Sequence, residues 1–139
     1  MYLIYNEKGD IVKVLSIREP YASLIKMKIK TIETRSFKTN YRGELYIHAS
    51  LSKSNQNNEL SKLINPMYGE IICKCKLVDC IYMTAEFIEN LRKNNEMEYK
   101  CGLYEVGRYA WVLENIEATQ PIKAKGRLGI WNFEYEKSK

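Results

Sequence analysis

The segment from Lys30 to Arg35 places a lysine, a carboxylate and an arginine within six residues of β-type sequence. Charges are costly to bury unless they are paired, so this cluster either lies on the surface or lines a site. Alternation along a strand places Glu33 and Arg35 on one face and Lys30 on the other. The simplest interpretation is an ion pair of little energetic worth if it is exposed. Lys30 joins the pair only if it precedes the regular pleating, in a turn made by residues 27–29.

The chemistry of these three side chains suits an anionic or nucleotide-like ligand if they converge. The planar fork of Arg35 matches a phosphate or a base edge. Glu33 can orient that fork, accept from a cytosine-type amino group, or act as a general base toward water. A partly desolvated Lys30 can polarise a carbonyl or hold a phosphate. Ligand binding is the main prediction, and catalysis by Lys30 and Glu33 is the second.

Two further arginines flank the cluster in the sequence. Arg18 comes just before a predicted helix and Arg42 ends the polar connection after the cluster. We interpret both as cations at the rim of the site, placed to contact a phosphate backbone. Arg18 has an alternative role, which is an ion pair with Glu19 or Glu33.

Three more residues near the cluster have a structural and a functional interpretation. Tyr21 forms the core or the wall of the site, or else offers a surface for base stacking. Ser16, at the predicted end of its strand, either bonds a ligand or caps the next helix. His48 is the single histidine, so no Ser/His or Cys/His nucleophile pair is evident. A structural histidine is favoured over an acid–base group.

The whole chain of 139 residues carries a formal net charge of +5 and has a sequence pI of 8.9. This value lies just below the pI of about 9 that marks a strong nucleic-acid footprint, so a polyanionic partner is permitted but not required. No apolar run approaches the roughly 20 residues of a membrane helix, and the first residues do not have the layout of a signal peptide. We expect one cytoplasmic domain spanning residues 1–139, without a cofactor or a membrane partner. The oligomeric state is open.

Four cysteines raise the question of a metal site or a disulfide. Cys73 and Cys75 are two apart in a β-branched segment, so a strand would direct both to one face. Cys80 and Cys101 complete no C-x-x-C pair, which zinc sites usually contain. Reduced, mostly buried thiols are the prediction, with no metal.

Turn signals and hydrophobic periodicity predict an α+β fold. Short helices are expected after Pro20, over residues 59–64 and after Thr84, which is a good N-cap. A mobile polar loop is expected over residues 50–58. The predicted strands cover residues 2–6, 10–17, a stretch beginning at Thr31, 44–49, 70–83 with a break near Asp79, 108–116 and 129–135. So many strands in one small domain favour a partly closed β-barrel of about five or six strands with two or three short helices, its core anchored by Trp111 and Trp131.

Five motifs in order resemble an ASCH domain, the activating-signal-cointegrator homology family. They are Ser16–Ala22, Lys30-x-x-Glu33-x-Arg35, Arg42–Ser50, Gly107–Glu114 and Gly126–Trp131. The resemblance runs from about Val14 to Trp131, and it implies a PUA-like β-barrel whose helices close a cleft. It also implies RNA or a nucleotide-like ligand as the partner in that cleft.

The same resemblance implies a possible activity. Some small members of the family are hydrolases acting on acylated cytidine, and others are described as cleaving RNA. Those hydrolases use a lysine and a threonine of the motif together with a later glutamate. Lys30 matches the lysine, but Glu33 stands at the position of the threonine. This departure favours binding over catalysis, with a small metal-free hydrolase as the alternative.

Overall fold

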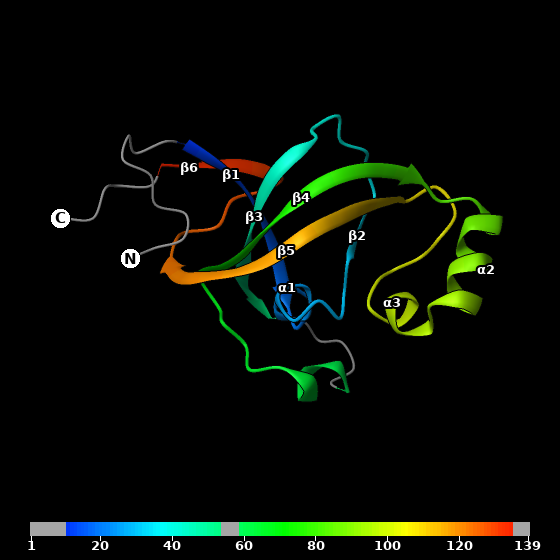
Figure 1. Ribbon diagram of the computed structural model, residues 1–139, viewed down its shortest axis with the longest axis horizontal. Coiled ribbons are helices and arrows are strands. Elements are labelled where there is room, and N and C mark those ends of the chain that lie inside the picture. Colours follow the sequence, from blue (N-terminus) through cyan, green and yellow to red (C-terminus); the bar gives the residue numbers. More distant parts are fainter. Residues whose placement is uncertain (1–10, 54–58, 135–139) are drawn as a thin grey trace.

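A computed structural model of the chain describes residues 11–53 and 59–134. The strand expected over residues 2–6 lies outside these residues. The described residues form six strands, three α-helices and one 3-10 helix (Figure 1), which are β1 (Ile11–Glu19), α1 (Tyr21–Lys26), β2 (Ile32–Arg35), β3 (Gly43–Lys53), η1 (Leu60–Leu63), β4 (Glu70–Tyr82), α2 (Ala85–Asn94), α3 (Glu96–Lys100), β5 (Tyr109–Lys123) and β6 (Ile130–Glu134).

The strands form one mixed sheet in the order β2-β5-β4-β3-β1-β6. β1 and β3 run parallel, and the other neighbouring strands are antiparallel. The sheet is open, because β2 and β6 at its two edges do not pair with each other. It nevertheless curls, since Arg35 on β2 donates a hydrogen bond to the carbonyl of Ser16 on β1. This architecture confirms the predicted α+β fold with a partly closed barrel of six strands.

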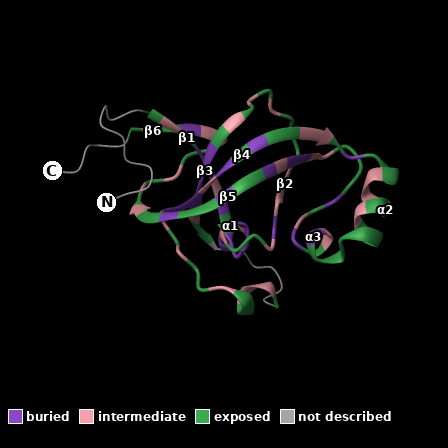
Figure 2. Ribbon diagram, viewed as in Figure 1, coloured by how far each residue is buried: buried purple, intermediate pink, exposed green. Residues whose placement is uncertain are grey.

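Buried apolar residues pack on both faces of the curled sheet, and Figure 2 shows the buried positions along the central strands and α1. The larger core joins β1, β3, β4 and β5 with helix α1, and it contains Trp111, Cys73 and Cys75. The smaller core on the other face contains Trp131 and Val14. Both tryptophans therefore anchor the core as predicted, and the two β4 cysteines share one face. Burial raises the pKa of Cys73 above its ordinary value and that of Cys75 to about 12.

Helix α1 is held by the carboxylate of Glu19, which is buried just before the helix begins. The two Glu19 oxygens accept from the backbone N–H and hydroxyl of Ser23 and from the N–H of Met67. Pro20 occupies the N-cap position without a side-chain cap, instead of the first helical turn that we predicted. The helix packs its apolar side against the larger core, so it closes one side of the barrel.

The other short elements differ from the sequence expectations at several points. The helix predicted over residues 59–64 is a single 3-10 turn, and β3 continues to Lys53 where a polar loop was expected. Residues 54–58 of that loop lie outside the described part. The break predicted near Asp79 is a register shift between Leu77 and Asp79. β5 continues to Lys123, beyond the predicted end of the strand at residue 116.

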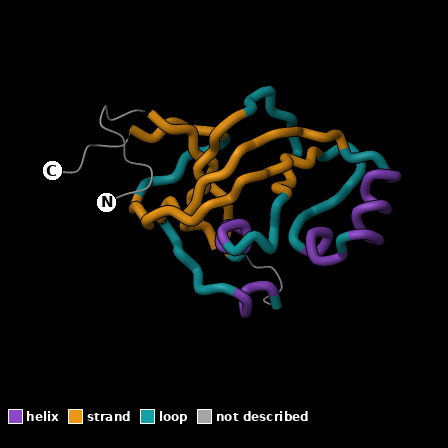
Figure 3. The backbone as a smooth tube through the Cα atoms, in the orientation of Figure 1, coloured by secondary structure: helices purple, strands orange, loops and turns teal. Residues whose placement is uncertain are grey.

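Helices α2 and α3 lie together at one end of the molecule (Figure 3). The Thr84 hydroxyl accepts from the backbone N–H of Phe87 at 3.1 Å, which confirms the predicted N-cap of α2. α3 was not predicted. Its N-cap, Asn95, accepts from the N–H of Glu98 at 3.2 Å. Among the described residues, no helix is long and apolar enough to cross a membrane.

Candidate functional site

Lys30 faces Glu33 because the chain turns sharply between α1 and β2. Lys28 has a φ of 65°, a left-handed conformation usually given to glycine, and its N–H donates to the carbonyl of Ile25. Lys30 therefore precedes the regular pleating, which starts at Ile32. Its Nζ lies 3.6 Å from Glu33 Oε1. The left-handed conformation of Lys28 therefore makes the turn that lets Lys30 join the cluster.

The Lys30 ammonium is buried, and its hydrogen-bonding capacity is used within the protein. It donates to the carbonyls of Ile32 and Cys101, both at 2.6 Å, and its side chain is 1% exposed. The ring of Tyr21 lies 5.6 Å from Nζ. Burial raises the pKa of Tyr21, with smaller contributions from Cys101 and Glu33. Lys30 thus holds Glu33 and the residue 101 loop together, and half-buried Tyr21 forms a wall beside it.

Glu33 and Arg35 form the predicted same-face pair. Arg35 Nε donates to Glu33 Oε2 at 3.0 Å, and Arg35 Nη2 donates to the carbonyl of Ser16 at 3.0 Å. The guanidinium carbon lies 5.8 Å from the ring centre of Trp111. The exposed fraction is 11% for the Glu33 side chain and 21% for that of Arg35. Arg35 is therefore fixed from two sides, yet part of its guanidinium reaches solvent.

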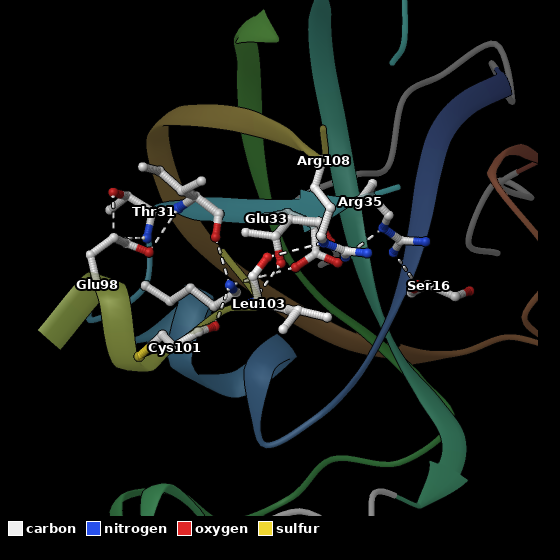
Figure 4. Close-up of polar contacts among 11 residues, drawn as sticks. Ser16, Thr31, Glu33, Arg35, Glu98, Cys101, Leu103 and Arg108 are labelled. Carbon is white, nitrogen blue, oxygen red and sulfur yellow. Dashed lines mark hydrogen bonds and ion pairs between the residues drawn. The ribbon is translucent and has the colours of Figure 1, made fainter. Parts of the chain in front are cut away.

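A buried glutamate that sequence reasoning missed secures the start of β2 (Figure 4). Glu98 on α3 accepts from the N–H and the hydroxyl of Thr31 and from the N–H of Ile32, at 2.8, 2.9 and 3.1 Å. Three bonds from otherwise unpaired donors explain why this carboxylate can be buried. The capping pattern Asn95-x-x-Glu98 was a signal for this helix start, since an N-cap residue followed by glutamate is typical there.

The segment after α3 covers the outer edge of β2. The N–H of Leu103 donates to the Thr34 hydroxyl at 3.1 Å, and Arg108 donates to the carbonyls of Thr34 and Leu103 at 3.3 and 3.0 Å. Gly102 allows this approach, because a Cβ there would lie 2.9 Å from Thr34 Cγ2. Arg108 is thus a further cation beside β2 that sequence reasoning did not assign to the site (Figure 4).

The two predicted rim cations are exposed, and neither bonds Lys30 or Glu33. Arg18 forms no hydrogen bond or ion pair within the described part of the chain. Its alternative pairing with Glu19 or Glu33 is wrong, since those carboxylates are taken up by Ser23 and Met67 and by Lys30 and Arg35, respectively. Arg42 Nη1 donates to the carbonyls of Thr39 and Tyr41, each at 2.9 Å.

Ser16 forms a polar network on the face of the sheet that carries the smaller core. It lies within β1 instead of at its end, and the parallel register places it beside His48. Ser16 Oγ is 2.9 Å from His48 Nδ1, and Trp131 Nε1 donates to Ser16 Oγ at 3.0 Å. His48 Nε2 is 2.8 Å from the carbonyl of Ala124. Because a carbonyl only accepts, Nε2 carries the proton and Nδ1 accepts from the serine.

Two sequence-based interpretations of this network change. The helix-capping role of Ser16 is wrong, because α1 has no side-chain cap. A Ser/His pair does exist, which the spacing of the two residues in the sequence did not indicate. His48 is 1% exposed and both of its ring nitrogens are paired within the protein, which agrees with the structural role that we favoured.

Folding stability is expected to fall as the pH drops below about 6.5, because of His48. Burial lowers the pKa of His48 below its ordinary value of 6.5, against a smaller opposite effect of backbone hydrogen bonds. The unfolded chain therefore binds the proton first on acidification, and the native state loses stability relative to it. Urea unfolding between pH 7.5 and 5.5 measures this loss. Since the chain has a single histidine, His48→Gln should flatten the profile, and an unchanged slope in that variant would contradict the assignment.

Comparison with known proteins places this site in a family. The model of the ASCH domain matches residues 15–125, which is most of the chain. The chain belongs to the ASCH domain family. The match includes Lys30, Glu33 and Arg35 as well as Ser16 and His48, so the whole polar network apart from Trp131 lies in the ASCH domain.

Solved structures support the same fold. An ASCH protein from Zymomonas mobilis superposes with a TM-score of 0.52 at 16% identity, covering 80% of this chain and 72% of that one. A Tyr-to-Phe mutant of the Zymomonas mobilis protein gives a TM-score of 0.51 at 17% identity, with 80% and 74% covered. At this identity the likeness concerns the ASCH fold alone. No curated protein matches the chain.

Proposed function

We propose that this ASCH domain binds RNA or a nucleotide-like ligand at the surface where the Arg35 guanidinium emerges. The observation that supports this most is the state of that guanidinium. Two of its five N–H donors are bonded, to Glu33 and to Ser16, and the others have no partner among the described residues. A rigid fork with free donors is the group that recognises phosphates and base edges.

Glu33 and Lys30 act in this proposal mainly by positioning Arg35. Glu33 holds the Arg35 Nε, and buried Lys30 holds Glu33. These successive contacts fix the Arg35 guanidinium before the ligand arrives, which reduces the conformational entropy lost on binding. Exposed Arg18 lies two residues after the Ser16 carbonyl that anchors Arg35, so it is placed to contact an adjoining phosphate. Contacts of Arg42, Tyr21 and Ser16 with a ligand stay predictions.

Loss of RNA binding in an Arg35 variant tests the proposal. The unmodified protein should bind a labelled RNA oligonucleotide with an affinity that falls as salt rises, because phosphate contacts release counterions. Arg35→Ala should weaken binding by roughly tenfold or more, the scale of losing one charge-assisted fork. Arg35→Lys should recover only part of it, since lysine has no planar fork. Fluorescence anisotropy across a salt titration measures all three proteins.

A matched control distinguishes the site from general charge. Arg92 is exposed on α2, where it pairs with Glu89, and Arg92→Ala removes the same charge from an element apart from β2 (Figure 1). It should leave the RNA affinity unchanged. Equal losses in the two alanine variants, or no binding of RNA or nucleotides by the parent protein, would refute the proposal.

A metal-free hydrolase remains the alternative, with Lys30 and Glu33 as the reacting groups. The lysine is occupied by two carbonyls and by Glu33, so the geometry supports a positioning role more than contact with a substrate. Incubation with acylated cytidine and with RNA examines this alternative. Turnover that disappears in Glu33→Gln would favour it.

A further inference from the structure

The end of β5 and the connection to β6 present a row of cations, and we call residues 123–127 the basic segment. Lys123, Lys125 and Arg127 are exposed, whereas the intervening Ala124 and Gly126 are partly buried. None of the three cations forms an ion pair within the described residues. The register of β4 and β5 places Glu70 opposite Lys123, so that charge is partly balanced. Lys125 and Arg127 are left as the uncompensated pair.

The backbone of this segment is pinned to the Ser16–His48 network. The N–H of Ala124 donates to the carbonyl of Gly69 at 3.0 Å, and its own carbonyl accepts from His48 Nε2 at 2.8 Å. Gly126 lies directly on the pair, since a Cβ there would come within 2.8 Å of His48 Cε1 and 2.9 Å of Ser16 Oγ. Ala124 is thus bonded inward and Gly126 packs inward, so the alternate residues Lys125 and Arg127 are held outward in a preorganised arrangement.

The same segment adjoins the Arg35 surface through Ser16. The pairing of β1 with β6 ends at Leu15 opposite Ile130. Ser16 is the first β1 residue beyond that pairing, and its carbonyl accepts from Arg35. Its hydroxyl meanwhile bonds the His48 that holds the basic segment. Arg35 and the segment that holds Lys125 and Arg127 therefore meet at one residue, because Ser16 bonds Arg35 through its carbonyl and lies against Gly126 through its hydroxyl.

We propose that Lys125 and Arg127 extend the Arg35 surface and bind successive phosphates of an RNA strand. The ligand would then be an oligonucleotide and not a mononucleotide. This inference rests on the proposed function and makes it more specific. A regular row of phosphates is the partner that matches spaced, outward cations beside an arginine fork. An acidic polypeptide offers carboxylates without that spacing, so it serves as the contrasting probe.

The test compares two double variants that remove the same residue types. Lys125→Ala/Arg127→Ala acts on the basic segment, and Arg92→Ala/Lys93→Ala removes an exposed arginine and lysine from α2 at the far end (Figure 1). Both should unfold at the parent temperature. For a labelled RNA of about 12 nucleotides, the first variant should lose roughly tenfold in affinity. Its slope of log K against log salt should shrink by about 1.4, the value for two phosphate contacts on a single strand.

Mononucleotide binding supplies the second measurement. Shifts in the NMR spectrum on adding cytidine 5′-monophosphate should be the same in the parent and in the Lys125→Ala/Arg127→Ala variant. The α2 variant should bind RNA like the parent, and polyglutamate should bind the parent far more weakly than RNA does.

Several outcomes overturn the inference while leaving the proposed function intact. In the first, the Lys125→Ala/Arg127→Ala variant binds RNA with the parent affinity while Arg35→Ala loses RNA binding. In the second, the Lys125→Ala/Arg127→Ala variant loses affinity for the mononucleotide and for RNA equally. In the third, the α2 variant loses as much RNA affinity as the Lys125→Ala/Arg127→Ala variant. Polyglutamate binding as tight as RNA binding also overturns it, since the segment would then be an unselective anion surface. A parent protein that binds neither RNA nor the mononucleotide overturns both.

Discussion

Replacement of Lys30 by methionine is expected to lower the free energy of unfolding by about 3 kcal/mol, as when one partner of a buried ion pair is removed. Methionine fills a similar volume but cannot donate. The carbonyls of Ile32 and Cys101 then lose their shared donor, and Glu33 keeps only Arg35 as a charged partner. Urea unfolding followed by circular dichroism measures the loss.

Lys93→Met is the control for this prediction. Lys93 is exposed on α2 and pairs only with Glu89, at 3.7 Å, so its removal should change stability by less than about 0.5 kcal/mol. If Lys30→Met were as stable as the parent, the ammonium would not hold the site together. The positioning role assigned to Lys30 would then have to be abandoned.

Replacement of Glu98 by alanine is expected to have an effect of similar size, about 3 kcal/mol. Two backbone N–H groups and the Thr31 hydroxyl lose their acceptor, and each unsatisfied buried donor costs about 1–3 kcal/mol. Water reaching the half-buried start of β2 reduces the total. Helix α3 also loses its main polar attachment to the strand that carries Glu33 and Arg35.

The neighbouring Glu96 provides the comparison, since it lies exposed on the same short helix. Glu96→Ala should change the free energy of unfolding only slightly. The loss of unfolding free energy in Glu98→Gln should lie between those of the two alanine variants, because the single amide oxygen can accept from only some of the three donors. Hydrogen exchange at the N–H groups of Thr31 and Ile32 reports directly on these bonds. Protection that persists in Glu98→Ala would show that the carboxylate is not their partner.

Short-range patterns in the sequence predicted much of the fold. Alternation correctly placed Glu33 beside Arg35 and Cys73 beside Cys75, because the side-chain period of a strand is local. The Thr84 cap of α2 was equally predictable, since it depends on a residue three positions later. Order and spacing of the five motifs were enough for the family resemblance, which the family match over residues 15–125 confirms.

Contacts between distant segments account for what sequence reasoning missed. Glu98 and Thr31 are 67 residues apart, and nothing in either segment indicates that they meet. Ser16 and His48 are paired only by the parallel register of β1 and β3. The turn at Lys28 was not predictable from the sequence, because a left-handed non-glycine residue has no reliable local signal.

The sequence by itself determined which residue types the chain brings to the site, the strands and helices that carry most of them, and the ASCH family. Only the tertiary structure decided how those residues share their hydrogen bonds. Lys30 faces inward because two carbonyls and Glu33 satisfy it there, whereas Arg35 keeps donors free toward solvent. The physical reason is that holding a charge in place depends on partners from remote segments. The docking of α3 brings the Cys101 carbonyl to Lys30, and the curling of the sheet brings the Ser16 carbonyl to Arg35.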